Sequence, residues 1–172
     1  MIQYRAPRAE EAAALATLGR DSFVETFGHL YAPEDLAAFL EDSYSPEGVA
    51  AQIASPRYIF RVAEEGGQLV GYCKLGLDVS LEYDPEGRNV VELKQLYLMA
   101  THQGVGVAQQ LMDWAIAEAE ARDADEMILS VWAENARAQR FYHRYGFEWI
   151  ADTYFMVGSH RDDEFLYRRK MR

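Results

Sequence analysis

The sequence predicts an α/β protein in which helical and β-rich segments alternate along one unbroken chain. Three observations support this fold class. Apolar residues recur at helical spacing in several segments, short β-rich runs lie between those segments, and no repeat, linker or low-complexity tract interrupts the order. A chain of 172 residues with 49% apolar residues is also long enough to bury a core. We therefore expect residues 1–172 to form a single domain.

The N-terminal part is predicted to be mainly helical. An alanine-rich segment over residues 8–27 carries apolar residues at helical spacing, and prolines in the first turn mark two further helices. Two β-rich runs follow, joined by Gly66 and Gly67, which is typical of a hairpin. The expected elements are a strand over 2–5, helices over 8–27, 33–42 and 46–54, and strands over 58–63 and 68–77.

The C-terminal part alternates between strands and helices after a loop at residues 80–89. One face of the segment 107–121 is apolar at helical spacing, and Gly146 is a natural stop for the helix before it. The expected elements are strands over 90–98 and 127–132, helices over 107–121 and 136–145, and strands over 147–150, 154–157 and 164–170.

A glycine-rich turn between a predicted strand and a predicted helix is the most informative motif. It consists of Gln103, Gly104, Val105, Gly106, Val107 and Ala108. Free backbone N–H groups at a helix start favour an anion, and glycine lets a phosphate approach the main chain closely. The dinucleotide fingerprint is excluded because Gln109 stands where a small residue is needed, and no Gly-Lys-Ser/Thr of a P-loop exists. The pattern is Gln/Arg-x-x-Gly-x-Gly/Ala.

With that pattern, the chain resembles the GCN5-related N-acetyltransferases, the GNAT family. Residues 135–147 strengthen the resemblance, because they match the family's Asn-x-x-Ala-x-x-Phe-Tyr-x-x-x-Gly-Phe stretch. The two motifs stand in the expected order, with room for a helix, a turn and a strand between them. The resemblance covers roughly residues 60–171, and the stretch around residues 26–34 is somewhat similar to bacterial polyamine acetyltransferases. It implies a central mixed, mostly antiparallel twisted sheet flanked by helices.

The resemblance also implies acetyl-CoA as the acetyl donor and assigns residues to it. The pyrophosphate would lie on Gln103–Ala108 of the glycine-rich turn, and the pantetheine arm would pair with the backbone of Leu96, Tyr97 and Leu98. Asn135 would bind the pantetheine or the adenosine side. Arg144 would reach a phosphate, with Arg137 and Arg140 as alternatives, since arginine suits bidentate contacts.

Two residues are candidates for the chemistry of acyl transfer to an amine. Glu92 lies in the strand 90–98 and is the candidate base, with ordered water or a salt bridge to Lys94 as the alternatives. Simple alternation places Glu92, Lys94, Leu96 and Leu98 on one face, although a bulge would shift this phase. Tyr142 matches the family tyrosine whose hydroxyl reaches the coenzyme sulfur, so it is the candidate acid. Its alternative role is aromatic packing.

Composition and charge exclude several functions. A formal net charge of −11 argues against nucleic acid or an anionic membrane as partner and is compatible with a cationic substrate or simply with a soluble acidic surface. The single cysteine, Cys73, lies in an apolar strand pattern and is expected in the core. We find no apolar run of membrane-spanning length, no signal-peptide pattern and no metal-ligand spacing, and therefore expect a cytoplasmic protein without a metal.

The resemblance to the GNAT family implies an N-acetyltransferase, and we expect it to act on a primary amine of a small molecule, polyamine-like or amino-acid-like, in a ternary complex. Two alternatives remain open at this point. One is acetylation of a protein N-terminus or lysine, and the other is a non-catalytic CoA-binding module. His29 and Tyr31 are candidates for acceptor contact or for packing. The family's frequent dimers make a homodimer an open expectation, although no interface signal stands out.

Overall fold

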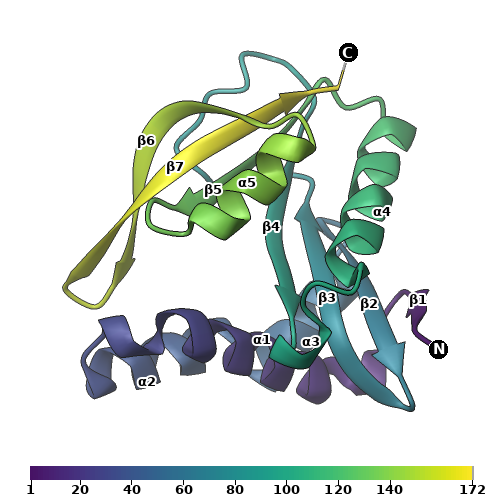
Figure 1. Ribbon diagram of the computed structural model, residues 1–172, viewed down its shortest axis with the longest axis vertical. Helices are drawn as coiled ribbons and strands as arrows, with labels where there is room; N and C mark the ends of the chain where they lie inside the picture. Colours follow the sequence, from purple (N-terminus) through teal and green to yellow (C-terminus); the bar gives the residue numbers. More distant parts are fainter. Residues whose placement is uncertain (172) are drawn as a thin grey trace.

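The computed structural model describes residues 1–171 and contains a seven-stranded sheet with helices on both faces (Figure 1). The strands lie in the order β1-β2-β3-β4-β5-β7-β6. Among the strands of residues 1–171, β4 and β5 run parallel, and the other neighbours are antiparallel. The sheet is therefore mixed and mostly antiparallel, which confirms the expected fold class. The strands are β1 Gln3–Arg5, β2 Tyr58–Glu65, β3 Gln68–Gly76, β4 Val90–Leu98, β5 Glu126–Trp132, β6 Glu148–Val157 and β7 His160–Lys170.

The helices lie close to their predicted positions. They are α1 Ala12–Phe27, α2 Pro33–Ser43, α3 Pro46–Ala54, α4 Val107–Ala121 and α5 Ala136–Arg144. The helix predicted from residue 8 begins with a separate 3-10 turn, Ala9–Glu11. Within residues 1–171, no helix has both the length and the apolar character that crossing a membrane would need.

The C-terminal strands differ from the prediction. The strands expected over 147–150 and 154–157 are a single strand, β6, so that prediction was wrong. Its register against β7 is irregular between Trp149 and Ala151, which lets the strand continue past the irregularity. The last strand begins at His160 rather than at Glu164, and this earlier start brings Asp162 into the sheet.

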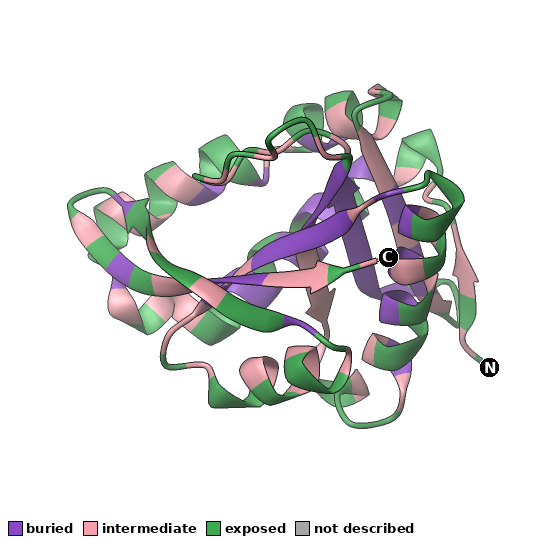
Figure 2. Ribbon diagram, turned by 90° about the horizontal axis from the view of Figure 1, so that it is seen from above, coloured by how far each residue is buried: buried purple, intermediate pink, exposed green. Residues whose placement is uncertain are grey.

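Helices from the two halves of the chain cover opposite faces of the sheet. α1 and α3 pack on β2 and β3 in a core that contains Leu15, Val49 and Val62. α4 packs on the other face through Leu111 and Met112, and α5 contributes to the same core. Figure 2 shows that the central strands between these layers are the most buried part of the molecule. The sheet therefore has two distinct sides, and the residues of each strand are divided between them.

A bulge in β4 changes which face its later residues occupy. The register of β4 against β3 skips Lys94. Leu93, before the bulge, belongs to the core under α4, and Leu96 and Leu98, after it, pack against the same core. Simple alternation, which separates Leu93 from Leu96, was therefore wrong beyond Lys94, because the extra residue shifts the phase by one.

The same bulge turns Gln95 and Tyr97 toward the N-terminal helices. The Tyr72 hydroxyl, in the core beneath α1, donates a hydrogen bond to Gln95 Oε1 at 2.7 Å. Tyr97 packs against that core as well. Gly76 makes room for the bulged residue, since a Cβ there would lie 2.4 Å from Lys94 Cε.

β4 and β5 pair only at their beginnings. The parallel ladder joins Val90–Glu92 to Glu126–Ile128, and beyond it the two strands diverge (Figure 1). The later residues of β4 have a strand partner on the β3 side only. Their other backbone N–H and C=O groups are therefore available to a ligand.

Candidate active site

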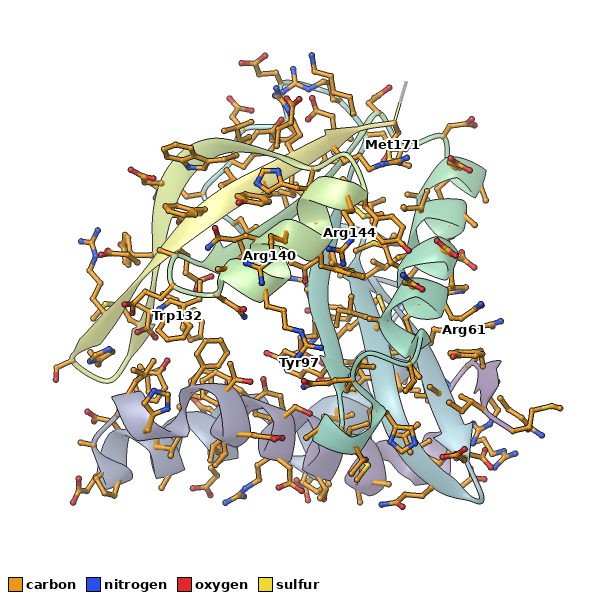
Figure 3. The ribbon with its side chains drawn as sticks, in the orientation of Figure 1. Arg61, Tyr97, Trp132, Arg140, Arg144 and Met171 are labelled. Carbon is orange, nitrogen blue, oxygen red and sulfur yellow. The ribbon has the colours of Figure 1, made fainter. Side chains whose placement is uncertain are left out.

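A cleft of about 1050 Å³ extends from the opening between β4 and β5 to the N-terminal helices. Its lining differs in charge from place to place. Arginines of α5 lie near the loop before α4, and carboxylates of β7 lie near α1 and α2. Figure 3 shows Arg140 and Arg144 on the α5 side of this space and Trp132 toward the N-terminal helices. The lining residues include Tyr31, Lys74, Glu92, Lys94–Leu98, Gln103, Gly104, Gly106, Ala108, Ser130, Trp132, Asn135, Arg137, Arg140, Phe141, Tyr142, Arg144, Asp162 and Glu164.

The glycine-rich turn forms an open concave surface at the start of α4. Gly104 and Gly106 have φ angles of +77° and +92°, a region that side chains with a Cβ rarely adopt. A Cβ on Gly104 would meet nothing within 4 Å, so the space above the turn is free. No side chain caps α4, which leaves its first backbone N–H groups available for an anion.

Not every residue of the predicted motif lines this surface with its side chain. Gln103, Gly104, Gly106 and Ala108 line the cleft. The side chain of Val105 points to solvent, and that of Val107 is buried in the core under α4. These two valines can therefore contribute to anion binding through their backbone only.

Three arginines of α5 place positive charge beside the turn. Arg137 donates a hydrogen bond to Gln103 Oε1 at 2.8 Å, which ties α5 to the turn. Arg140 and Arg144 line the cleft, and the Arg144 guanidinium lies 5.8 Å from the ring centroid of Phe141. The turn and these side chains fit a ligand with several phosphates, as arginine binds phosphate oxygens well.

Asn135 lines the cleft and also begins α5. Its Oδ1 accepts a hydrogen bond from the backbone N–H of Ala138 at 3.1 Å, which is an N-cap contact. The capping role explains why asparagine suits this position, and contact with a ligand remains a prediction.

Tyr142 lines the cleft. Its ring packs edge-on against Phe141 and Phe147, so the packing role expected as an alternative is present. Burial, more than the nearby Cys73 and Tyr97, raises the pKa of the Tyr142 phenol above its ordinary value. The hydroxyl therefore carries its proton at neutral pH and can donate it.

Glu92 is buried and bound by four donors. Its Oε1 accepts from the backbone N–H groups of Ser80 and Leu81 at 2.8 and 3.1 Å. Its Oε2 accepts from Ser80 Oγ at 2.8 Å and from Lys94 Nζ at 2.7 Å. The salt bridge to Lys94 is therefore present, and the carboxylate fastens the loop before β4. The base role remains a prediction.

Two carboxylates in the cleft were missed from the sequence. Asp162 and Glu164 project from alternate positions of β7. Asp162 is buried, accepts a short hydrogen bond from the Tyr31 hydroxyl and lies 3.0 Å from His160 Nε2. Burial raises the pKa of Glu164, the charge of Asp162 raises it further, and a hydrogen bond from Ser130 lowers it. The sequence carried one signal for this pair: Asp162 and Glu164 are two residues apart, so in a strand they lie on the same face. The predicted strand began only at residue 164, and the signal was therefore not recognised.

The two N-terminal candidates and the cysteine have clear positions. Tyr31 is buried and lines the cleft, where it binds Asp162. His29 lies in the 3-10 turn Gly28–Leu30 and is not part of the cleft lining. Cys73 is fully buried, which confirms the expected core position, and burial raises the pKa of its thiol.

A sequence model of the acetyltransferase (GNAT) family matches residues 20–147 of this chain. The chain belongs to the GNAT family. This membership confirms the predictions of an acyltransferase and of acetyl-CoA as its acetyl donor.

Relatives extend the comparison over most of the chain. An uncharacterized N-acetyltransferase of Lactobacillus delbrueckii subsp. lactis is 30% identical over 156 residues, which cover 90% of this chain and 88% of the relative. The PaiA N-acetyltransferase of Thermoplasma acidophilum, solved in complex with coenzyme A, has the same fold. It superposes with a TM-score of 0.80 at 22% identity and covers 99% of both chains.

Two GNAT relatives with named substrates match shorter parts of the chain. The aminoalkylphosphonate N-acetyltransferase of Salmonella typhimurium is 28% identical over 102 residues, 59% of this chain and 64% of that protein. The spermine/spermidine N(1)-acetyltransferase of Bacillus subtilis is 31% identical over 91 residues, 52% of this chain and 59% of that protein. Apart from the amine that is acetylated, the two named acceptors differ in charge: a phosphonate group is negative, and the further amines of spermine and spermidine are positive.

Proposed function

We propose that this GNAT protein transfers the acetyl group of acetyl-CoA to a primary amine of a small, positively charged molecule, by direct attack in a ternary complex. The observation that carries the proposal is the charge division of the cleft. Arginines and free helix N–H groups suit the phosphates of the donor, whereas Asp162 and Glu164 suit a cationic acceptor.

The donor would be held by residues that the cleft brings together. Gln103, Gly104, Gly106 and Ala108 would bind the pyrophosphate, and the arginines of α5 would bind a further phosphate. The unpaired edge of β4 at Leu96, Tyr97 and Leu98 would hydrogen-bond the amide groups of the pantetheine arm, as an added strand does. Bound acetyl-CoA would supply the acetyl group as a thioester.

Tyr142 would act as the acid. Tyr142 lines the cleft, and its protonated hydroxyl would donate to the departing sulfur. No covalent intermediate with the protein is needed, because holding the amine against the donor supplies much of the rate. Binding of both substrates would also displace water from the cleft, and water could otherwise compete with the amine for the acetyl group.

The charges near the N-terminal helices favour a polyamine over an aminoalkylphosphonate. A phosphonate would face Asp162 and Glu164, and the two lysines that line the cleft already make contacts within the protein. Lys94 is bound to Glu92, and Lys74 donates to Gln52 Oε1 at 3.0 Å. A second ammonium group of a polyamine would instead meet carboxylates and aromatic rings such as Trp132.

The experiment is a comparison of two acceptors. Wild-type protein with acetyl-CoA should acetylate spermidine with a kcat/KM at least about 10-fold above that for 2-aminoethylphosphonate, which corresponds to about 1.4 kcal/mol. Mass spectrometry would identify the acetylated product. A preference for the phosphonate would contradict a cationic acceptor site, although it would leave the acetyltransferase assignment intact.

A further inference from the structure

We propose that Glu164 is a catalytic residue that binds the acceptor ammonium in the cleft and takes its proton. This inference rests on the proposed function and assigns the base of that reaction. Three observations support it: the face of β7 on which Glu164 lies, the absence of a cation among the groups that perturb it, and the state of the other carboxylates in the cleft.

The strand pairing directs Glu164 into the cleft. Glu164 pairs with Trp132 of β5, and Leu166, two residues later, packs with Val90 and Ile128 on the side away from α4. The intervening Phe165 packs toward the core under α4 and α5. Glu164 therefore shares the face that the N-terminal helices cover, next to Trp132, whose ring lies 5.5 Å from that of Phe27 in α1.

The other two carboxylates of the cleft are occupied. Glu92 accepts four hydrogen bonds, one of them from Lys94, so protonating it would break an ion pair. Asp162 is held by Tyr31 and His160. The groups that shift the pKa of Glu164 are Ser130 and Asp162, with no cation among them. Glu164 is thus the carboxylate with capacity to accept a proton.

The surroundings of Glu164 suit a base at neutral pH. Burial and the negative charge of Asp162 raise its pKa from the ordinary value of 4.5, and the Ser130 hydrogen bond opposes them. The phenols of Tyr31 and Tyr97, on other elements, interact electrostatically with Glu164; their pKa values are raised, mainly by burial, so both stay neutral. A base whose pKa moves toward the working pH transfers protons more effectively.

The proton balance of the step is closed. Glu164 takes one proton from the acceptor ammonium, and the neutral amine nitrogen forms the C–N bond of the acetamide as the thioester C–S bond breaks. Tyr142 gives its proton to the sulfur and recovers one from the same nitrogen. Glu164 then releases its proton to solvent, so one amide, one thiol and one proton leave.

The kinetic test uses Glu164→Gln with spermidine and acetyl-CoA. We expect kcat to fall about 100-fold or more and the acidic limb of the kcat–pH profile to disappear, because the amide cannot take a proton. The affinity for coenzyme A, measured by calorimetry, should stay unchanged. The matched control is Asp163→Asn, which removes one charge from the neighbouring position, where the side chain is 80% exposed. It should keep both kcat and the pH profile.

Two kinetic outcomes would overturn the inference. An unchanged kcat with an unchanged acidic limb would show that another group takes the proton. A raised KM with normal kcat would reduce Glu164 to an acceptor-binding residue. Absence of turnover by the wild-type protein with spermidine would instead count against the proposed acceptor, which separates the two failures.

A second readout needs no turnover. Infrared difference spectra between the wild-type protein and Glu164→Gln should show a protonated-carboxyl band that titrates above the pH expected of an ordinary glutamate. A carboxyl that titrates at or below its ordinary value would contradict the assignment, whether or not the variant retains activity.

Discussion

At the scale of single residues, two glutamates on the same face of the sheet have different surroundings. Glu92 is held by Ser80, Leu81 and Lys94, whereas Glu164 lies in the cleft and Ser130 is the hydrogen-bond donor that affects its pKa. Sequence alternation found Glu92 because its strand pattern is clear. It missed Glu164, whose importance depends on how the fold surrounds each carboxylate and not on the local sequence pattern.

Tyr142→Phe should lower kcat about 100-fold while changing coenzyme A affinity less than about threefold, because it removes a proton donor and keeps the packed ring. Steady-state kinetics and calorimetry measure the two effects. Tyr145→Phe is the matched control, at the C-cap of the same helix. It loses a 3.1 Å hydrogen bond to Asp113 on the protein surface and should retain kcat. Equal kcat in Tyr142→Phe would remove Tyr142 from the acid role.

Lys74 should make stability depend on pH in the alkaline range. Burial, and then the charge of Lys94, lowers its pKa from 10.5 to about 8. The unfolded chain therefore binds more protons than the folded protein between these values, so the free energy of unfolding rises with pH there, by up to about 3 kcal/mol from this group. Lys74→Met should lack this rise. Denaturant titrations of both proteins at pH 7.5 and 9.5 measure the difference, and parallel curves would contradict it.

At the scale of secondary-structure elements, local sequence signals predicted the positions of most helices and strands. The predicted elements lie close to the observed ones where such a signal exists: proline at the start of α2 and α3, the apolar face of α4, and the glycines between β2 and β3. The bulge at Lys94 was not predictable from alternation, because it depends on space over Gly76 in a neighbouring strand. That bulge decides which residues of β4 face the acceptor side.

Gly106→Trp should weaken coenzyme A binding about 100-fold or more, because the indole would fill the space above the turn and block the N–H groups of α4. Gly67→Trp is the control. Gly67 also has a positive φ, +85°, with no atom within 4 Å of an added Cβ, and lies in the β2–β3 turn. Both variants carry similar backbone strain, so only the first should lose affinity in calorimetry. Equal affinities would refute the assignment of the turn.

At the scale of the whole molecule, the topology combines segments that are distant in the chain. The donor side could be predicted because its two motifs are continuous in sequence, at residues 103–108 and 135–147. The acceptor side could not, since it joins α1, the turn at Tyr31, β4 and β7, and requires the sheet order β4-β5-β7. The net charge of −11 indicated only that a positively charged acceptor would be compatible with the protein.

The central claim is that this cleft joins acetyl-CoA to a small cationic amine. The most direct measurement is release of free coenzyme A from acetyl-CoA, followed with a thiol reagent, in the presence of polyamines, amino acids, aminoalkylphosphonates or short peptides. We predict release that depends on the polyamines and exceeds that with the other classes. No release with any class, together with no binding of acetyl-CoA by calorimetry, would contradict both the donor and the acceptor assignments.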